Sequence, residues 1–149
     1  MNRSLLAGVI LLTGFGIKIP EAWSHCQVPC GIFDESARLK MMDEDLTTIK
    51  KAMQQIAVLH SKRDPSSLNQ ATRWVMTKED HANHIMDLIA NYFLAQRVKI
   101  VEKGKKDYEV YLKQLADYHA VLVAAMKCKQ TADLSQVDGL ARALKELAP

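Results

Sequence analysis

The sequence contains few residues that break helices and shows no pattern that builds sheets. Its 149 residues include six glycines and four prolines, and no low-complexity tract or internal repeat is present. No segment alternates apolar and polar residues with the period of two that marks a half-buried strand. These absences argue against a sheet-based fold and favour one compact unit of long helices.

Cysteine and net charge are also sparse, and both exclude functions. The three cysteines nowhere form Cys-x-x-Cys-His, so a bundle with covalently attached c-type haem is excluded. The formal net charge is only +3. If residues 1–24 are removed, Lys and Arg fall from 20 to 18 and Asp and Glu from 17 to 16, which leaves +2. A charge this small does not indicate a nucleic-acid partner.

Residues 1–24 have the composition of a cleavable leader. Arg3 precedes an apolar run over residues 5–17, and Ala22 and Ser24 are the small residues that a signal peptidase requires. A membrane anchor is the alternative, but the run is shorter than the roughly 20 apolar residues of a spanning helix, and no second run follows. We predict cleavage after Ser24, which leaves 125 residues without a stable anchor. An exported protein, periplasmic or secreted, is expected, with a processed cytoplasmic protein as the alternative.

Hydrophobic spacing predicts four amphipathic helices. In four segments apolar residues recur at steps of three and four, the spacing of helices that pack lengthwise on their neighbours. The predicted inward residues are Leu39, Met42, Leu46, Ile49, Met53 and Ile56; then Leu68, Ala71, Val75, Ala82, Ile85, Ile89 and Tyr92; then Tyr108, Tyr111, Leu115, Tyr118, Leu122 and Ala125; and finally Leu134, Val137, Leu140, Leu144 and Leu147.

Helix-breaking residues separate these segments. Asp34 can cap the first helix, and Pro65 with Ser66 and Ser67 combines a stop with an N-cap signal. Gly104, among lysines, marks the next break, and the fourth helix is expected from about residue 131. Four helices with short connections predict an all-α four-helix bundle over residues 34–149.

The segment between the leader and the bundle, residues 25–33, carries the most distinctive chemistry. It begins His-Cys-Gln-Val-Pro-Cys-Gly, so cleavage would free the α-amine of His25, which titrates near about 8. That amine, the Cys26 amide nitrogen and the thiolates of Cys26 and Cys30 make a planar set of two nitrogens and two sulfurs. The His25 imidazole is a possible axial ligand. Such a set suits Ni(II) or Cu(II), whereas zinc prefers a tetrahedral cage.

A disulfide is the competing interpretation of the same two cysteines. In an oxidising compartment Cys26 and Cys30 could simply pair. The Cys-x-x-x-Cys spacing alone does not decide between a metal site and a disulfide.

The motif His-Cys-x-x-Pro-Cys-Gly at a processed N-terminus resembles the nickel hook of the nickel-dependent superoxide dismutases. The similarity extends to residues 69–99 and 125–134. The resemblance implies one nickel ion per subunit, bound by His25, Cys26 and Cys30, with the imidazole joining in the Ni(III) state. It also implies conversion of superoxide to O2 and H2O2 by Ni(II)/Ni(III) cycling, and assembly of four-helix bundles into a homohexamer.

One residue departs from that family pattern. The family usually has Tyr three residues after the second Cys, and this chain has Phe33. Its ring can still shape access to the metal, but a phenol that could order water or an anion is missing. A non-enzymatic exported protein, with residues 25–33 as a metal carrier or a Cys26–Cys30 disulfide, is therefore the second hypothesis. Some members of the family also hold the axial His with an acidic residue and an Arg, for which Arg73, Lys78 and Glu79 are candidates.

Other candidates carry less specific signals. His81 and His84, three residues apart on one helical face, could bind metal with Glu79 or Asp80, although surface or interface groups are commoner in such a segment. Cys128 is expected to be a small buried hydrophobe, with an intermolecular disulfide as the alternative. The remaining candidates are predicted to be structural or solvated, with anion steering as an alternative for the lysines: His60, His119, Lys103, Lys105 and Lys106.

Overall fold

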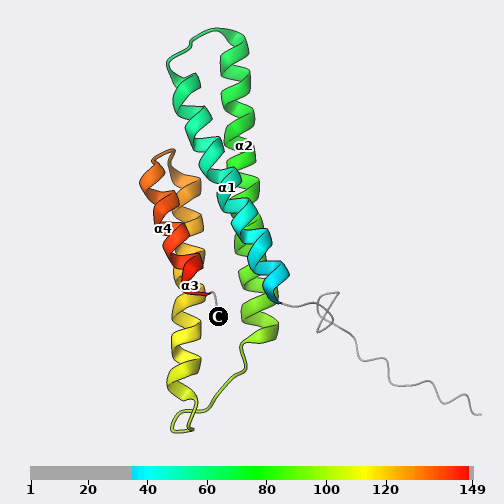
Figure 1. Cartoon of the computed structure of the whole chain (residues 1–149), viewed down its shortest axis with the longest axis vertical. Helices are drawn as coiled ribbons and strands as arrows, with labels where there is room; N and C mark the ends of the chain where they lie inside the picture. The colour runs from blue at the N-terminus through cyan, green and yellow to red at the C-terminus, as the bar shows by residue number, and fades with distance from the viewer. Residues whose placement is uncertain (1–34, 148–149) are drawn as a thin grey trace, which may run out of the picture.

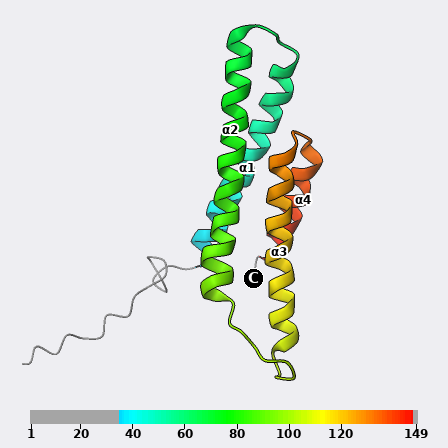
Figure 2. The ribbon, with the colours of Figure 1, turned by 180° about the vertical axis from the view of Figure 1, so that it is seen from behind.

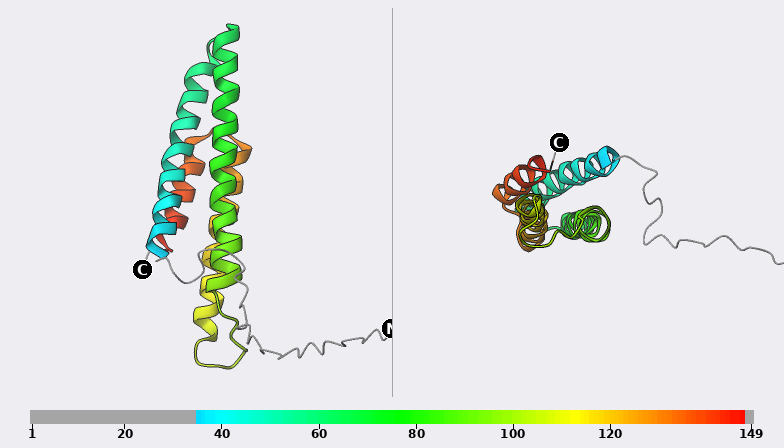
Figure 3. Two further views of the ribbon diagram at one scale, coloured as in Figure 1. Left: turned by 90° about the vertical axis from the view of Figure 1, so that its right-hand side faces the viewer. Right: turned by 90° about the horizontal axis from the view of Figure 1, so that it is seen from below.

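A computed structural model of the chain describes residues 35–147, and 83% of these residues are helical with no strand among them. The elements in chain order are α1 (Glu35–His60), α2 (Pro65–Asp87), the π-helix η1 (Leu88–Arg97), α3 (Tyr108–Gln130) and α4 (Leu134–Lys145). η1 continues α2 directly. α1 packs on α2, α2 on α3, α3 on α4 and α4 on α1, which closes the bundle (Figures 1 and 3). The predicted all-α four-helix bundle is confirmed.

The core contains predicted inward-facing residues from every helix, although on α3 only Ala125 of the predicted face is fully buried and Val121 lies beside it. Cys128 lies in it, fully buried, as the sequence predicts. The buried apolar side chains are Met42, Ile49, Ala52 and Met53 of α1; Ala82 and Ile85 of α2; Leu88, Ile89, Tyr92 and Phe93 of η1; Val121, Ala125 and Cys128 of α3; and Val137, Leu140 and Leu144 of α4. None of the helices within residues 35–147 is both long and apolar enough to cross a membrane.

The prediction of inward-facing residues is wrong at the start of α2. Leu68 is 57% exposed and Val75 is 40% exposed. The α1–α2 hairpin extends past the α3–α4 connection (Figures 1 and 2), so this part of α2 has only α1 as a neighbour. Leu134, the first residue of α4, is also more exposed than predicted.

Two helix starts differ from the sequence prediction, and both involve aspartate. Asp64, not Ser66 or Ser67, caps α2, with Pro65 as the first helical residue. Its Oδ1 accepts the Ser67 N–H at 2.9 Å and its Oδ2 accepts the Ser67 hydroxyl at 2.6 Å, and these hydrogen bonds lower the Asp64 pKa. Similarly, α4 begins at Leu134 after an Asp133 cap, three residues later than expected. A carboxylate accepts from the unpaired N–H groups and also suits the positive end of the helix.

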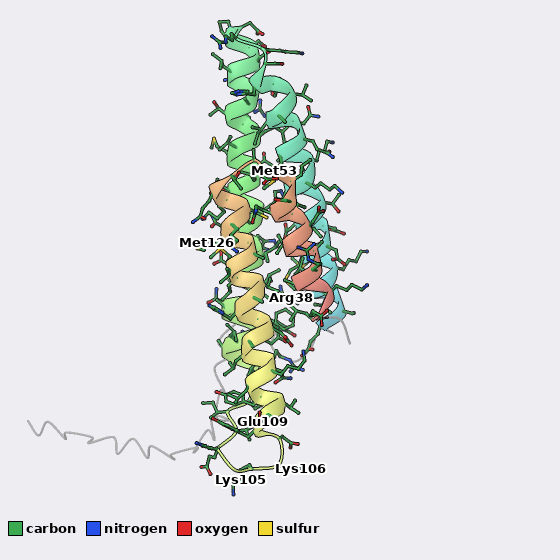
Figure 4. All side chains as sticks on the ribbon, turned by 90° about the vertical axis from the view of Figure 1, so that its left-hand side faces the viewer. Arg38, Met53, Lys105, Lys106, Glu109 and Met126 are labelled. Atoms are coloured by element: carbon green, nitrogen blue, oxygen red, sulfur yellow. The ribbon has the colours of Figure 1, made fainter. Side chains whose placement is uncertain are left out.

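Gly104 lies in the connection between η1 and α3, where the sequence predicts a break. Its φ is +87°, a conformation that side chains disfavour. The neighbouring Lys103, Lys105 and Lys106 are exposed, and Lys105 and Lys106 are at the end of the bundle (Figure 4). Their placement agrees with a solvated loop.

The sequence pattern does not distinguish η1 from an ordinary α-helix. Its buried residues continue in rows of four, from Ile85 through Ile89 to Phe93 and from Leu88 through Tyr92 to Gln96. The wider turn closes with the Val98 N–H donating to the Phe93 carbonyl at 2.9 Å, five residues back, as in a π-helix. In η1 both rows of buried residues face the bundle, beside the start of α1.

Candidate functional site

The four residues predicted to form the catalytic site, His25, Cys26, Cys30 and Phe33, lie outside residues 35–147. The leader prediction and the Asp34 cap fall outside the described range as well. The described part of the chain starts close to this segment, because α1 begins at Glu35, two residues after Phe33. The contacts of the first turn of α1 therefore fix the point at which residues 25–33 join the bundle.

Two arginine contacts hold that first turn. The Arg97 Nε donates to the Glu35 carboxylate, which joins the end of η1 to the start of α1. One helical turn later, the Arg38 guanidinium lies over the Tyr92 ring, 5.0 Å from its centroid. Arg38 lies on the lower part of α1 in Figure 4. Both contacts run from α1 to η1, so the start of α1 is held against the π-helix.

A row of aromatic rings connects these contacts on η1 with α3 and the core. Tyr92 meets Phe93 edge to face at 5.1 Å, and Phe93 stacks on Tyr118 of α3 at 5.2 Å between centroids. Burial raises the pKa of Tyr118, and the nearby Glu35 charge raises it further, while Arg97 acts in the opposite direction. We call Glu35, Arg38, Tyr92, Phe93, Arg97 and Tyr118 together the anchor cluster.

Lys78, one candidate for holding the axial His, is committed to a different contact. Its side chain is 4% exposed. It donates to the Cys128 carbonyl at 2.8 Å, to the Lys129 carbonyl, and to Glu79 Oε1 at 3.0 Å. An ammonium has three N–H donors, so all three are used within α2 and the last turn of α3.

The contacts of the other two candidates can be described, although His25 itself lies outside residues 35–147. Glu79 completes the same contact, with its second oxygen 3.8 Å from the Lys129 ammonium. Arg73 is exposed on α2. In the structure Lys78 lies in the α2–α3 seam, where it donates to carbonyls that a helix end leaves unpaired, and Glu79 pairs with the Lys78 and Lys129 ammonium groups.

A second buried charge, Asp45, pairs with both predicted histidines. His81 Nδ1 lies 2.6 Å from Asp45 Oδ1, and His84 Nδ1 lies 2.7 Å from Asp45 Oδ2. The carboxylate beside the two rings is Asp45, and not Glu79 or Asp80, which the alternative of a metal site would use; both rings are partly exposed, in agreement with the favoured interpretation as surface groups. The face of α2 that carries the two rings packs on α1, which brings in Asp45 from 36 residues away, while Glu79 belongs to the α3 side.

Within residues 35–147 no group of three or more His, Cys, Asp or Glu side chains is arranged to hold a metal ion. The donor set predicted at residues 25–30 thus has no three-ligand competitor in the described part of the chain. Two thiolates with two planar nitrogens would suit Ni(II) better than metals that prefer hard oxygen ligands.

Sequence reasoning missed Asp45, Glu35 and Arg97, although one signal was available. Asp45 falls on the apolar stripe between Met42 and Ile49, where an uncharged residue is expected. A charged residue at a stripe position indicates a buried pair, since an unpaired buried charge is strongly unfavourable. Glu35 and Arg97 are separated by 62 residues, and no local pattern marks their pairing.

Comparison with known proteins supplies a family. A family model described as nickel-containing superoxide dismutase matches residues 20–149. The match includes the His-Cys-x-x-Pro-Cys-Gly motif and every described helix. No curated protein and no solved structure matches the chain.

Proposed function

This chain belongs to the nickel-containing superoxide dismutase family, and from that premise we propose that its nickel is bound by an N-terminus that processing frees at His25. The family makes the protein an oxidoreductase with superoxide as substrate and nickel as cofactor. The observation that supports the proposal is that the matched range contains the motif His-Cys-x-x-Pro-Cys-Gly, in which His25, Cys26 and Cys30 have the chemistry of nickel donors.

The proposed donors are the His25 α-amine, the Cys26 amide and thiolate, and the Cys30 thiolate, with the His25 imidazole as axial ligand. When bound, nickel supplies the one-electron Ni(II)/Ni(III) couple by which one superoxide is oxidised to O2 and a second, with two protons, is reduced to H2O2. The two thiolates and the deprotonated amide are strong donors, which stabilise the higher oxidation state. Backbone nitrogen is therefore part of this catalytic set.

Processing is a chemical requirement of this donor set. While residues 1–24 are attached, the His25 nitrogen is an amide and cannot provide an amine. Cleavage after Ser24 creates that donor. The same leader supports export to the periplasm or the exterior, with a processed cytoplasmic protein as the alternative.

The bundle contributes attachment and access. The anchor cluster fixes the start of α1, two residues after Phe33. We assign Phe33 the role of shaping the path by which superoxide reaches the metal, because its ring has the size of the family Tyr without the hydroxyl. Assembly into a homohexamer, which the family resemblance supports, belongs to the same proposal and is tested by the molar mass of the mature protein in solution.

The deciding experiment measures the N-terminal sequence, the nickel content and the superoxide consumption of one purified sample. We expect His25 at the N-terminus, one nickel per chain and rapid consumption of superoxide. Active protein that retains residues 1–24 would contradict the site assignment. Nickel-loaded protein without activity would instead favour the second function, a non-enzymatic metal carrier, for which Phe33 is the supporting observation.

A further inference from the structure

We propose that His81 and His84 form a second metal site, which takes one divalent transition-metal ion through their two Nε2 atoms while Asp45 holds both rings from behind. This site lies in the α1–α2 seam. It uses no residue of the nickel donor set, and it does not depend on the function proposed above.

Asp45 fixes the hydrogen positions on both rings. Its side chain is 6% exposed, and a buried carboxylate must be partnered. Its two oxygens each meet one imidazole, at 2.6 and 2.7 Å. A carboxylate can only accept, so each ring carries a hydrogen on Nδ1 and donates it to Asp45.

The other nitrogen of each ring is left for a ligand. With the hydrogen on Nδ1, a neutral imidazole presents a lone pair at Nε2, the atom with which histidine commonly binds metals. Neither Nε2 accepts or donates a hydrogen bond among the described residues. The His81 and His84 side chains are 37% and 42% exposed. Each ring therefore has a buried, hydrogen-bonded edge and an edge open to solvent.

The two rings also lie close together. His81 and His84 are one helical turn apart on α2, and their Nδ1 atoms meet the two oxygens of one carboxylate. Metal-binding histidines almost always donate their second ring N–H to a carboxylate, a carbonyl or water, which fixes the ring and strengthens the ligand. Asp45 provides this support to two rings at once.

The contrast with Lys78 shows why this cluster and not the other is a candidate. Lys78 uses all three of its donors on protein oxygens, which leaves nothing for a ligand. The histidine pair keeps two acceptor nitrogens at the surface. Two protein ligands, with water in the remaining positions, also agree with the lack of a three-ligand group within residues 35–147. Imidazole suits zinc, nickel and copper, and Cu(II) is bound most tightly by a given nitrogen site.

The test uses Cu(II) as the probe on the full chain carrying His25→Ala, Cys26→Ser and Cys30→Ser. These three changes remove the side-chain ligands of the proposed nickel site, so the outcome is independent of that proposal. We expect one Cu(II) per chain with an electron paramagnetic resonance spectrum showing two imidazole nitrogens. His81→Asn or His84→Asn added to this background should weaken binding at least about tenfold, and Asp45→Asn by about 10- to 100-fold.

His60→Asn and His119→Asn are the matched controls, because these two histidines are exposed and no other histidine lies near them in the sequence. Both should leave the titration unchanged. Equal binding by the parent and by the His81 and His84 variants, or no binding by the parent, would overturn the proposal. If Asp45→Asn lowers the helix content, His84→Asn decides, because it leaves the His81–Asp45 contact in place.

Discussion

The N-terminal segment and the bundle organise their polar groups in different ways. All of the proposed nickel donors come from residues 25–30, so that chemistry is local in sequence. In the bundle, the polar contacts between helices join residues far apart: Asp45 with His81, Lys78 with the Cys128 carbonyl, and Glu35 with Arg97 are separated by 36, 50 and 62 residues. A local site can be lost by one substitution without disturbing the fold. The difference therefore predicts that activity and stability respond to separate sets of residues.

The largest expected effect is the loss of nickel binding and of all superoxide consumption in Cys26→Ser or Cys30→Ser. A hydroxyl cannot replace the thiolate that makes Ni(III) accessible. Metal analysis and superoxide decay measure this loss. The free energy of unfolding should change by less than about 0.5 kcal/mol when metal-free variant and metal-free parent are compared, because bound metal itself stabilises the folded state. An active, nickel-bound Ser variant would show that the thiolate at that position is not required for nickel binding or turnover.

The next effect distinguishes the cysteines of the two regions. Burial raises the pKa of Cys128 from 9.0 to about 11, and the thiolate is the reactive form. At pH 8 about one thiol in a thousand is ionised at that pKa. In metal-free, reduced protein, iodoacetamide should label Cys26 and Cys30 while Cys128 reacts at least about a hundred times more slowly.

Mass spectrometry counts the labels on each chain. Unfolding in urea should expose Cys128, so that it too is labelled. Three labels at equal rates in folded protein would show that Cys128 is accessible, contrary to its burial.

A third prediction addresses the bundle alone. Lys78→Met should lower the free energy of unfolding by about 2–3 kcal/mol, since hydrogen bonds from a charged group to buried carbonyls are lost. Urea unfolding measures the change. Lys50→Met, at an exposed lysine of α1, is the control and should stay within about 0.5 kcal/mol. Nickel content per folded chain should not change. A parallel loss of nickel would show that nickel binding at the N-terminal segment depends on the Lys78 contacts in the bundle.

The smallest expected effect is that of Phe33→Tyr. If access depends mainly on the shape of the ring, the variant should keep its nickel and change its rate by well under tenfold, which is less than about 1.4 kcal/mol in barrier. Superoxide decay at matched nickel occupancy measures it. A natural protein that binds nickel without turnover, together with a Tyr variant that gains strong activity, would show that the hydroxyl is required.

The same contrast explains what the sequence could predict. The donor motif and the apolar seams are local or periodic patterns, so the candidate ligands and the four helices can be read from the sequence directly. The pairing of Asp45 with His81 and His84 depends on which helix faces meet, and periodicity alone does not give that. The exposure of Leu68 has a similar cause, because helix length relative to the neighbouring helices decides it.

Neither a local motif nor the apolar periodicity predicts the π-helix. Its buried rows have the same spacing of four that an α-helix tolerates, so only the packed structure distinguishes the two. Helix caps are intermediate: Asp64 and Asp133 are standard N-cap residues, but Ser66 and Ser67 near Asp64 are equally standard, so residue type alone does not choose between them.

The unequal lengths of the two helical hairpins have a consequence for motion. The segment of α2 around Leu68, Val75 and Met76 is exposed and faces only α1, whereas residues 82–93 lie in the core. Segments with few buried apolar contacts open locally at lower free energy than the core does. Backbone amides in the N-terminal part of α2 should therefore exchange with solvent much sooner than those of η1. The chain that leads to the proposed nickel donors joins α1 beside η1, and so it is attached where opening is expected to be slowest.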